Sequence, residues 1–151
     1  MIHIVLVSPE IPQNTGNIAR TAAVTGCPLH LVGPLGFEIN ESRIRRAGLD
    51  YWPSVQLRQY ADFDEYLTAW PNAQRFCLTT KGEKTYSQIE YPRDAHLLFG
   101  RETAGLPEEI LTKHQTLRVP MRPNQRSLNL ANTVALVTYE ALRQQGFPGL
   151  E

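Results

Sequence analysis

The sequence predicts a single α/β domain in which a mostly parallel sheet is flanked by helices. Short apolar runs alternate with longer amphipathic stretches along the chain, which is typical of repeated strand and helix units. The 151 residues fall within the usual size of one domain, about 100 to 200 residues. Neither an internal repeat nor a linker is apparent, so we expect residues 1–151 to form one domain.

The apolar runs predict six short strands, most of them rich in β-branched or large apolar residues. They are expected at residues 2–7, 29–32, 55–58, 76–79, 96–99 and 117–119. The amphipathic stretches predict helices at residues 15–25, 41–47, 62–70, 107–113 and about 128–145. Gly26 and Gly146 are expected to end the first and last helices, because glycine readily adopts the left-handed conformation that follows many helix C-termini.

The charge balance limits how the chain could bind nucleic acid. Fifteen lysine and arginine residues match fifteen aspartate and glutamate residues, so any such surface has to be local. Only Lys81, Lys84 and Lys113 are lysines, and this bias toward arginine favours bidentate contacts to phosphate. The two cysteines lie far apart and indicate neither a disulfide framework nor a zinc site. With no targeting segment and no apolar run near the roughly 18 residues of a membrane span, we expect a cytoplasmic protein outside membranes.

Several common enzyme motifs are absent. Neither G-x-G-x-x-G nor G-x-x-x-x-G-K-[ST] occurs, which argues against a dehydrogenase and a P-loop protein. The absence of G-x-S-x-G argues against a hydrolase triad. No two histidines have metal-ligand spacing, so no metal is expected. His3, His30 and His96 lie in apolar strands, where we expect structural roles.

Three polar loops follow expected strands, at the sheet edge where open α/β folds bind ligands. In the first loop, residues 9–20, a helix that begins near Thr15 would align Asn17 and Arg20 on one face, toward a polar ligand. Alternatively, Asn14 caps that helix and Arg20 is a solvated surface cation.

The second loop, residues 100–107, places two glycines around Glu102 before a helix at Pro107. Glycine permits close approach of the backbone to a ligand. The alternative is that Glu102 lies in solvent or pairs with Arg101 or another cation.

The third loop, residues 120–132, is dense in polar side chains that a ligand could contact: Arg122, Arg126, Ser127, Asn129 and Asn132. Alternatively, Ser127 or Asn129 caps the last helix and the arginines lie on a surface turn.

A basic cluster lies on the helix expected at residues 41–47 and consists of Arg43, Arg45 and Arg46. Tyr51 and Trp52 follow closely, and such a mixture of cations and aromatic rings suits phosphate contacts and base stacking. The alternative is a solvated helix face whose neighbouring aromatic residues pack in the core or in a subunit contact.

Together the three loops resemble the motifs of the SPOUT superfamily of RNA methyltransferases, specifically its SpoU branch of ribose 2′-O-methyltransferases. The matching segments are residues 14–20, the stretch LFGRETAGLP at 98–107, and VPM at 119–121 with SLNLAN at 127–132. The short chain, RRAGLDY at 45–51 and LTTKG at 78–82 resemble the minimal members, which methylate the anticodon wobble nucleotide of tRNA, cytidine or uridine 34.

The resemblance implies a C-terminal trefoil knot, which general rules of chain topology disfavour. It also implies S-adenosylmethionine as cofactor, S-adenosylhomocysteine as product, and no metal. Carried over residue by residue, the cofactor would lie against Leu78, Thr79, Gly100, Glu102, Val119, Met121, Ser127 and Leu128.

The resemblance further implies that Arg20 contacts the reacting ribose hydroxyl. A guanidinium is protonated and has no acceptor, so it suits stabilisation of a developing alkoxide better than general base catalysis. The residues implied to hold the ribose, the phosphate or Arg20 in register are Asn14, Asn17, Glu102, Ser127 and Asn129. Those expected to contact tRNA are Arg20, Arg43, Arg45, Arg46, Arg122 and Arg126.

The family is dimeric, with active sites that use residues of both subunits, so a homodimer is expected. The last helix offers an apolar stripe, Val134, Val137 and Leu142, for that interface. The alternatives are a methyltransferase for rRNA or another tRNA position, a SPOUT-like RNA-binding module without catalysis, and a nucleotide-binding regulator.

Overall fold

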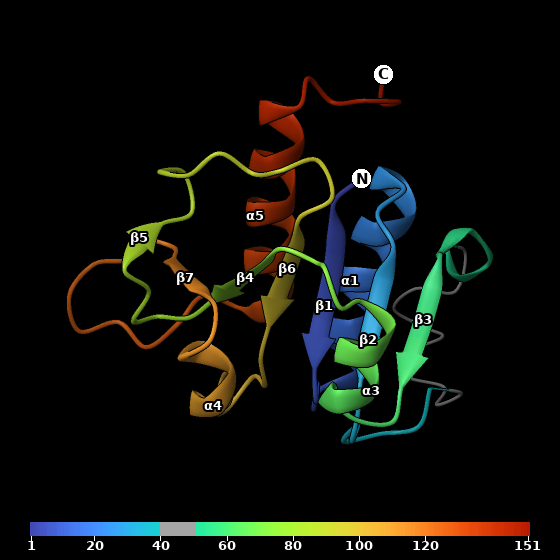
Figure 1. Cartoon of the computed structure of the whole chain (residues 1–151), viewed down its shortest axis with the longest axis horizontal. Helices are drawn as coiled ribbons and strands as arrows, with labels where there is room; N and C mark the ends of the chain where they lie inside the picture. The colour runs from blue at the N-terminus through green and yellow to red at the C-terminus, as the bar shows by residue number, and fades with distance from the viewer. Residues whose placement is uncertain (40–50) are drawn as a thin grey trace.

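The computed structural model describes residues 1–39 and 51–151, and within these residues seven strands form one parallel sheet (Figure 1). The strand order is β3-β2-β1-β6-β4-β7-β5. The bounds are β1 His3–Val7, β2 Leu29–Val32, β3 Leu57–Tyr60, β4 Arg75–Leu78, β5 Lys84–Thr85, β6 His96–Phe99 and β7 Gln115–Arg118. The predicted α/β class with a parallel sheet is therefore confirmed.

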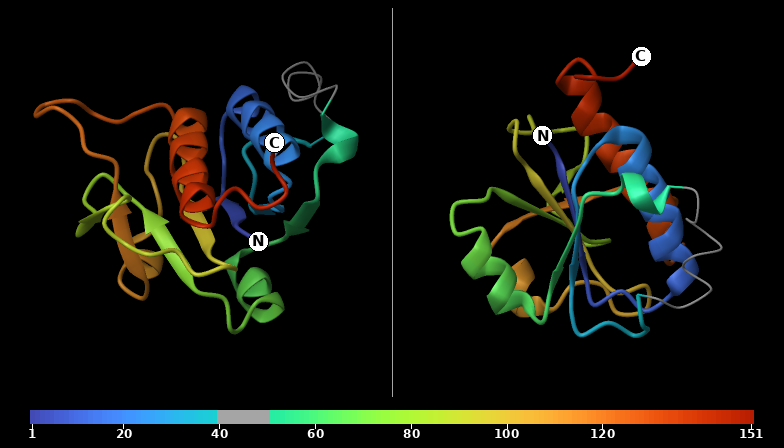
Figure 2. Two further views of the ribbon diagram at one scale, coloured as in Figure 1. Left: turned by 90° about the horizontal axis from the view of Figure 1, so that it is seen from above. Right: turned by 90° about the vertical axis from the view of Figure 1, so that its right-hand side faces the viewer.

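Helices cover both faces of the sheet (Figure 2). Helices α1 (Pro12–Thr25) and α5 (Leu130–Gln144) lie side by side on one face, and α3 (Phe63–Ala69) and α4 (Glu108–Leu111) lie on the other. A short 3-10 helix, η1 (Trp52–Ser54), precedes β3. The helix predicted at 41–47 lies outside the described residues.

The core is divided between the two faces because successive side chains of a strand point to opposite sides. On β1, Ile4 and Leu6 join the cluster beneath α1 and α5, whereas Val5 and Val7 join the cluster beneath α3 and α4. Both faces of this strand are covered, which agrees with the continuous apolar run that follows His3.

Several predicted boundaries differ from the structure, and two of the differences have clear local reasons. Strand β3 begins two residues later than predicted, because the chain first forms η1, closed by a hydrogen bond from the Val55 amide to the Trp52 carbonyl. Helix α1 begins three residues earlier, at Pro12, whose fixed φ angle suits a first helical position. Ile11 is therefore the N-cap, and the alternative that Asn14 caps this helix is wrong.

The glycines predicted to follow the first and last helices are confirmed. Gly26 and Gly146 have φ angles of 73° and 76°, in the left-handed region that glycine adopts without strain. At the start of α5, the Asn129 side chain accepts a hydrogen bond from the Asn132 amide, as one of the alternatives for the third loop predicted.

The apolar stripe of α5 packs against the chain's own sheet. Val134, Val137 and Leu142 are buried in the core, so the expectation that this stripe forms a subunit interface is wrong. On another face of the helix, Leu136 and Tyr139 remain exposed three residues apart.

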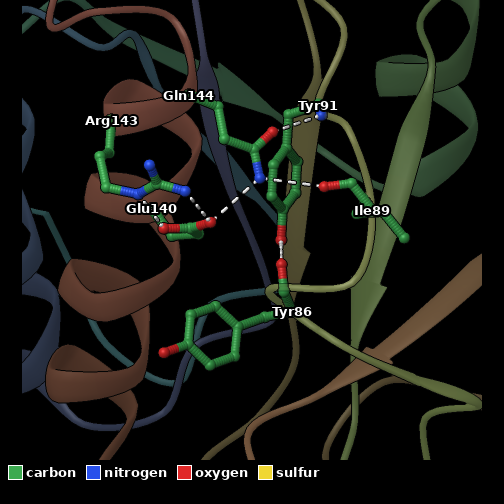
Figure 3. Close-up of polar contacts among 6 residues, drawn as sticks. All are labelled: Tyr86, Ile89, Tyr91, Glu140, Arg143 and Gln144. Atoms are coloured by element: carbon green, nitrogen blue, oxygen red, sulfur yellow. Dashed lines mark hydrogen bonds and ion pairs between the residues drawn. The ribbon is translucent and has the colours of Figure 1, made fainter.

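A polar cluster fixes the C-terminal end of α5 (Figure 3). The Gln144 side chain accepts a hydrogen bond from the Tyr91 amide at 3.0 Å and donates to the Ile89 carbonyl at 2.9 Å and to Glu140 at 3.0 Å. The Tyr91 hydroxyl donates to the carbonyl of Tyr86. These contacts tie α5 to the segment before β6, so the helix presents Asn129 at a defined place near the sheet's carboxyl edge.

Candidate functional site

A cleft of about 900 Å³ lies at the carboxyl ends of β1, β4, β6 and β7. All three polar loops contribute to it, as expected from the position of ligand sites in open α/β sheets. The cleft is lined by every residue that the resemblance assigned to a cofactor: Leu78, Thr79, Gly100, Glu102, Val119, Met121, Ser127 and Leu128.

The cleft combines apolar and polar lining. Met121 and Leu128, both on the third loop, line the cleft and are 38% and 42% exposed. Leu78 and Val119 add further apolar surface, while Ser127 adds a hydroxyl. Such a lining suits a ligand that has a flat apolar ring and a few polar groups.

The second loop folds tightly on itself at the cleft. Backbone hydrogen bonds of 3.2 and 3.0 Å join Arg101 to Gly105, and Gly105 has a φ of 69°. A Cβ atom on Gly100 would lie only 2.1 Å from the carbonyl carbon of Gly105. We predicted that glycine allows a ligand to approach the backbone here, but the close approach that the structure demonstrates is between two parts of the loop.

Glu102 joins the second loop to the first. Its carboxylate accepts hydrogen bonds from the backbone amides of Glu10 and Ile11, at 2.8 and 3.1 Å. In return, the Glu10 carboxylate accepts bonds from the Thr103 amide at 3.2 Å and hydroxyl at 2.7 Å. We call these four bonds the carboxylate clasp; they replace the alternatives of a solvated Glu102 or a pair with Arg101.

Sequence reasoning missed Glu10. The hydrogen bonds from Thr103 hold the pKa of the Glu10 carboxyl below its usual value, so the side chain is a charged acceptor at neutral pH. One signal could have identified it: Glu10 and Glu102 both follow strands, β1 and β6, that are neighbours in the sheet. The two glutamates can be predicted to lie close together only when the pairing of β1 with β6 is known.

The clasp gives a testable prediction about Glu102→Gln. A glutamine side chain offers one carbonyl oxygen, and its NH₂ group would face a backbone amide that is itself a donor. We expect the free energy of unfolding to fall by about 1–3 kcal/mol, the typical cost of an unpaired polar group. Urea unfolding would measure it, with Glu109→Gln on the exposed side of α4 as the matched control. Equal stability of the two variants would contradict the clasp.

A second polar contact joins the first and third loops. The Asn129 side-chain amide donates to the Asn14 side-chain oxygen at 3.2 Å. Asn14 is buried and faces the cleft, whereas Asn129, Ser127 and Arg126 are exposed along its rim. The structure thus brings Asn14, Glu102, Ser127 and Asn129 to one place.

Arg20 and Asn17 do not line the cleft within one chain. Both side chains are exposed, and the Arg20 guanidinium stacks on the Tyr51 ring at 4.7 Å from its centroid. Arg20 is six residues along α1 from Asn14, which corresponds to about 9 Å at 1.5 Å per residue. Arg122 is exposed on the third loop and also lies outside the lining. Arg43, Arg45 and Arg46 lie outside the described residues.

Comparisons with known proteins point to one family. Residues 1–139 match the SpoU rRNA Methylase family. The tRNA (cytidine(34)-2′-O)-methyltransferase of Yersinia pestis is 48% identical over 157 residues, which cover 99% of this chain and 97% of the relative.

Solved structures are similar over nearly the whole chain. One described as "Structural insights into the 2-OH methylation of C/U34 on tRNA" has a TM-score of 0.94 and 48% identity, and 97% of each chain is covered. An AdoMet-bound rRNA methyltransferase from Sinorhizobium meliloti has a TM-score of 0.84 and 27% identity, with 94% of this chain and 56% of that chain covered. Among residues 1–39 and 51–151, no helix has the length and apolar character needed to cross a membrane.

Proposed function

Because the chain belongs to the SpoU rRNA methylase family, we propose that it methylates the ribose 2′-hydroxyl of cytidine or uridine 34 in tRNA. The chain is an RNA 2′-O-methyltransferase. We propose nucleotide 34 as its target because the chain is similar over its full length to an enzyme named for that nucleotide. The cleft supports the proposal, because it gathers the residues of all three loops at one end of the sheet.

S-adenosylmethionine fits the residues present in the cleft. The exposed Met121 and Leu128, with Leu78 and Val119, would cover its adenine, and Thr79 and the loop backbone would bond its polar groups. When bound, this cofactor supplies an activated methyl group on a sulfonium centre, which the ribose 2′-oxygen attacks to release S-adenosylhomocysteine. The mechanism that we propose needs no metal.

The chain's own contribution is alignment of the ribose and stabilisation of its oxygen. Holding reactants in register can supply roughly 7 to 11 kcal/mol in favourable comparisons. The Asn14–Asn129 bond and the carboxylate clasp hold the cleft walls in place for this purpose. Arg20 would donate hydrogen bonds to the oxygen as negative charge develops. Since a guanidinium has no acceptor, the ribose proton leaves to another group.

We propose that the working form is a homodimer in which Arg20 of one chain serves the cleft of the other. Arg20 and Asn17 lie outside the cleft of their own chain, so a single chain has an incomplete set of the expected residues. Exposed apolar side chains on α1 and α5, Val24, Leu136 and Tyr139, offer surface for the contact. A dimer would also double the RNA-binding arginines of a chain with zero net charge.

We extend the proposal to the C-terminal trefoil knot and to a cytoplasmic location. The knot is supported by the third loop, which returns from β7 to the same cleft as the second loop before α5 begins. The location is supported by Cys27 and Cys77, which are both free thiols.

The proposed function is tested by incubating the purified protein with methyl-labelled S-adenosylmethionine and tRNA that lacks ribose methylation. Nuclease digestion and mass spectrometry should identify a 2′-O-methylated cytidine or uridine, and ribosomal RNA should not be labelled. Label in ribosomal RNA alone would show that the substrate is ribosomal RNA and not tRNA. Cofactor binding without any transfer would instead support an RNA-binding module without catalysis.

A further inference from the structure

Three buried histidines lie together at the amino ends of adjacent strands, at the sheet edge opposite the cleft. His3 and His96 begin β1 and β6 and are register partners, while His30 lies near the start of β2. One ring nitrogen from each lies within 4.8 Å of the other two. Parallel register places them together although they are far apart in the sequence, which is why spacing along the chain did not indicate a metal site.

Two of the three rings already have a tyrosine hydroxyl bonded to the nitrogen that faces away from the cluster. His3 Nδ1 and His30 Nε2 are 2.8 Å apart, and the rings of His3 and His96 stack at 4.2 Å between centroids. His30 Nδ1 faces the Tyr60 hydroxyl at 3.0 Å, and His96 Nδ1 faces the Tyr66 hydroxyl at 2.8 Å. A metal-bound imidazole commonly uses its other nitrogen to bond such a neighbour, which fixes the ring orientation.

Burial disfavours the charged form of all three imidazoles. Burial lowers the pKa of His3 to about 4 and the pKa of both His30 and His96 to about 3. His3 Nδ1 and His30 Nε2 are hydrogen-bonded at 2.8 Å, so one of them carries a proton that has to move to the other nitrogen of its ring when an ion binds.

The cluster is also reachable from solvent. A hollow of about 620 Å³ borders it, and His3, His96, Trp70 and Asp94 are among the residues that line this hollow. An ion could enter from this side, and a water molecule could occupy a fourth coordination position there.

We propose that His3, His30 and His96 bind one Zn²⁺ ion, with solvent as the fourth ligand. At a zinc–nitrogen distance of about 2.0–2.1 Å, tetrahedral ligand nitrogens are about 3.3 Å apart. The closest pair, His3 Nδ1 and His30 Nε2, would separate slightly from 2.8 Å, and the stacked rings of His3 and His96 would rotate so that their nitrogens converge. This site lies apart from the methyl-transfer cleft, so it adds to the proposed function without depending on it.

The test is calorimetric titration of chelator-treated, dialysed protein with Zn²⁺, and with Co²⁺ as a spectroscopic probe. We expect one Zn²⁺ per chain and a cobalt absorption band of tetrahedral type. His3→Asn should remove saturable binding, whereas His114→Asn, on the connection between α4 and β7, should bind as the parent does. Tyr66→Phe keeps the ring and all three histidines but removes an outer partner, and it should weaken binding about 10- to 100-fold.

The melting temperature provides a second readout of folding. Zn²⁺ should raise it in the parent protein and in His114→Asn but not in His3→Asn, whose circular dichroism should show a folded protein. Absence of saturable Zn²⁺ binding in the folded parent would overturn the proposal. Equal affinity in the folded His3→Asn, Tyr66→Phe and His114→Asn variants would do so as well, because the ion would then bind elsewhere.

Discussion

Arg20→Ala is expected to reduce methyl transfer by about 100- to 1,000-fold, the range typical of losing a hydrogen-bond donor aimed at developing negative charge. Cofactor affinity should remain near that of the parent, because in the proposed dimer Arg20 contacts the ribose oxygen and not the cofactor. Single-turnover methylation and calorimetric titration with S-adenosylhomocysteine would separate the two effects. A similar loss of both would assign Arg20 to the cofactor site or to folding.

The same variant also tests the shared active site. Leu128→Glu places a carboxylate on the exposed cleft wall and should prevent cofactor binding while the core stays intact. When Arg20→Ala and Leu128→Glu chains are co-expressed, each mixed dimer should contain one intact site. Recovery of activity is expected only if Arg20 serves the partner's cleft, and no recovery in isolated mixed dimers would contradict that arrangement.

Gly100→Ala is expected to abolish detectable cofactor binding and to lower the free energy of unfolding by about 1–3 kcal/mol, the usual cost of overpacking. The new Cβ would lie 2.1 and 2.2 Å from backbone atoms of Gly105 and Leu106, so the loop has to move as a whole. Glu102 lies between Gly100 and Gly105 in the sequence. Movement of the second loop would therefore also break the hydrogen bonds from Glu102 to the amides of Glu10 and Ile11 in the first loop. Calorimetric titration and urea unfolding would measure the two losses.

Gly26→Ala is the matched control for Gly100→Ala. Gly26 has a φ of 73°, yet a Cβ there would meet no atom within 4 Å. Its substitution should therefore cost only the strain of a left-handed residue, about 1–2 kcal/mol, and leave cofactor binding unchanged. Cofactor binding by Gly100→Ala at the level of this control would contradict the tight packing of the second loop.

The parts of the fold that the sequence predicted well are those with a strong local signal. β2 and β6 have the predicted bounds because both are short apolar runs buried on both faces. β5 was missed because its two residues, Lys84 and Thr85, are too few to form a pattern, and only their pairing with β7 makes them a strand. The early start of α1 was missed because Asn14 is a good N-cap residue, although here it is buried inside the helix.

The cleft could be predicted because each of its loops follows a strand and carries a recognisable motif. The carboxylate clasp and the histidine cluster could not, because both depend on the pairing of β1 with β6, which no local pattern encodes. The position of Arg20 outside the cleft could not be predicted either. Asn14 and Arg20 belong to one sequence motif, but the helix separates them by about two turns.

The most direct test of the account uses an anticodon stem-loop in which nucleotide 34 carries 2′-deoxyribose, compared with one in which a neighbouring loop nucleotide does. Labelled S-adenosylmethionine would report methyl transfer to each. We predict no transfer to the first substrate and normal transfer to the second, because only the first lacks the attacking oxygen. Equal labelling of both would contradict methylation of the ribose at nucleotide 34.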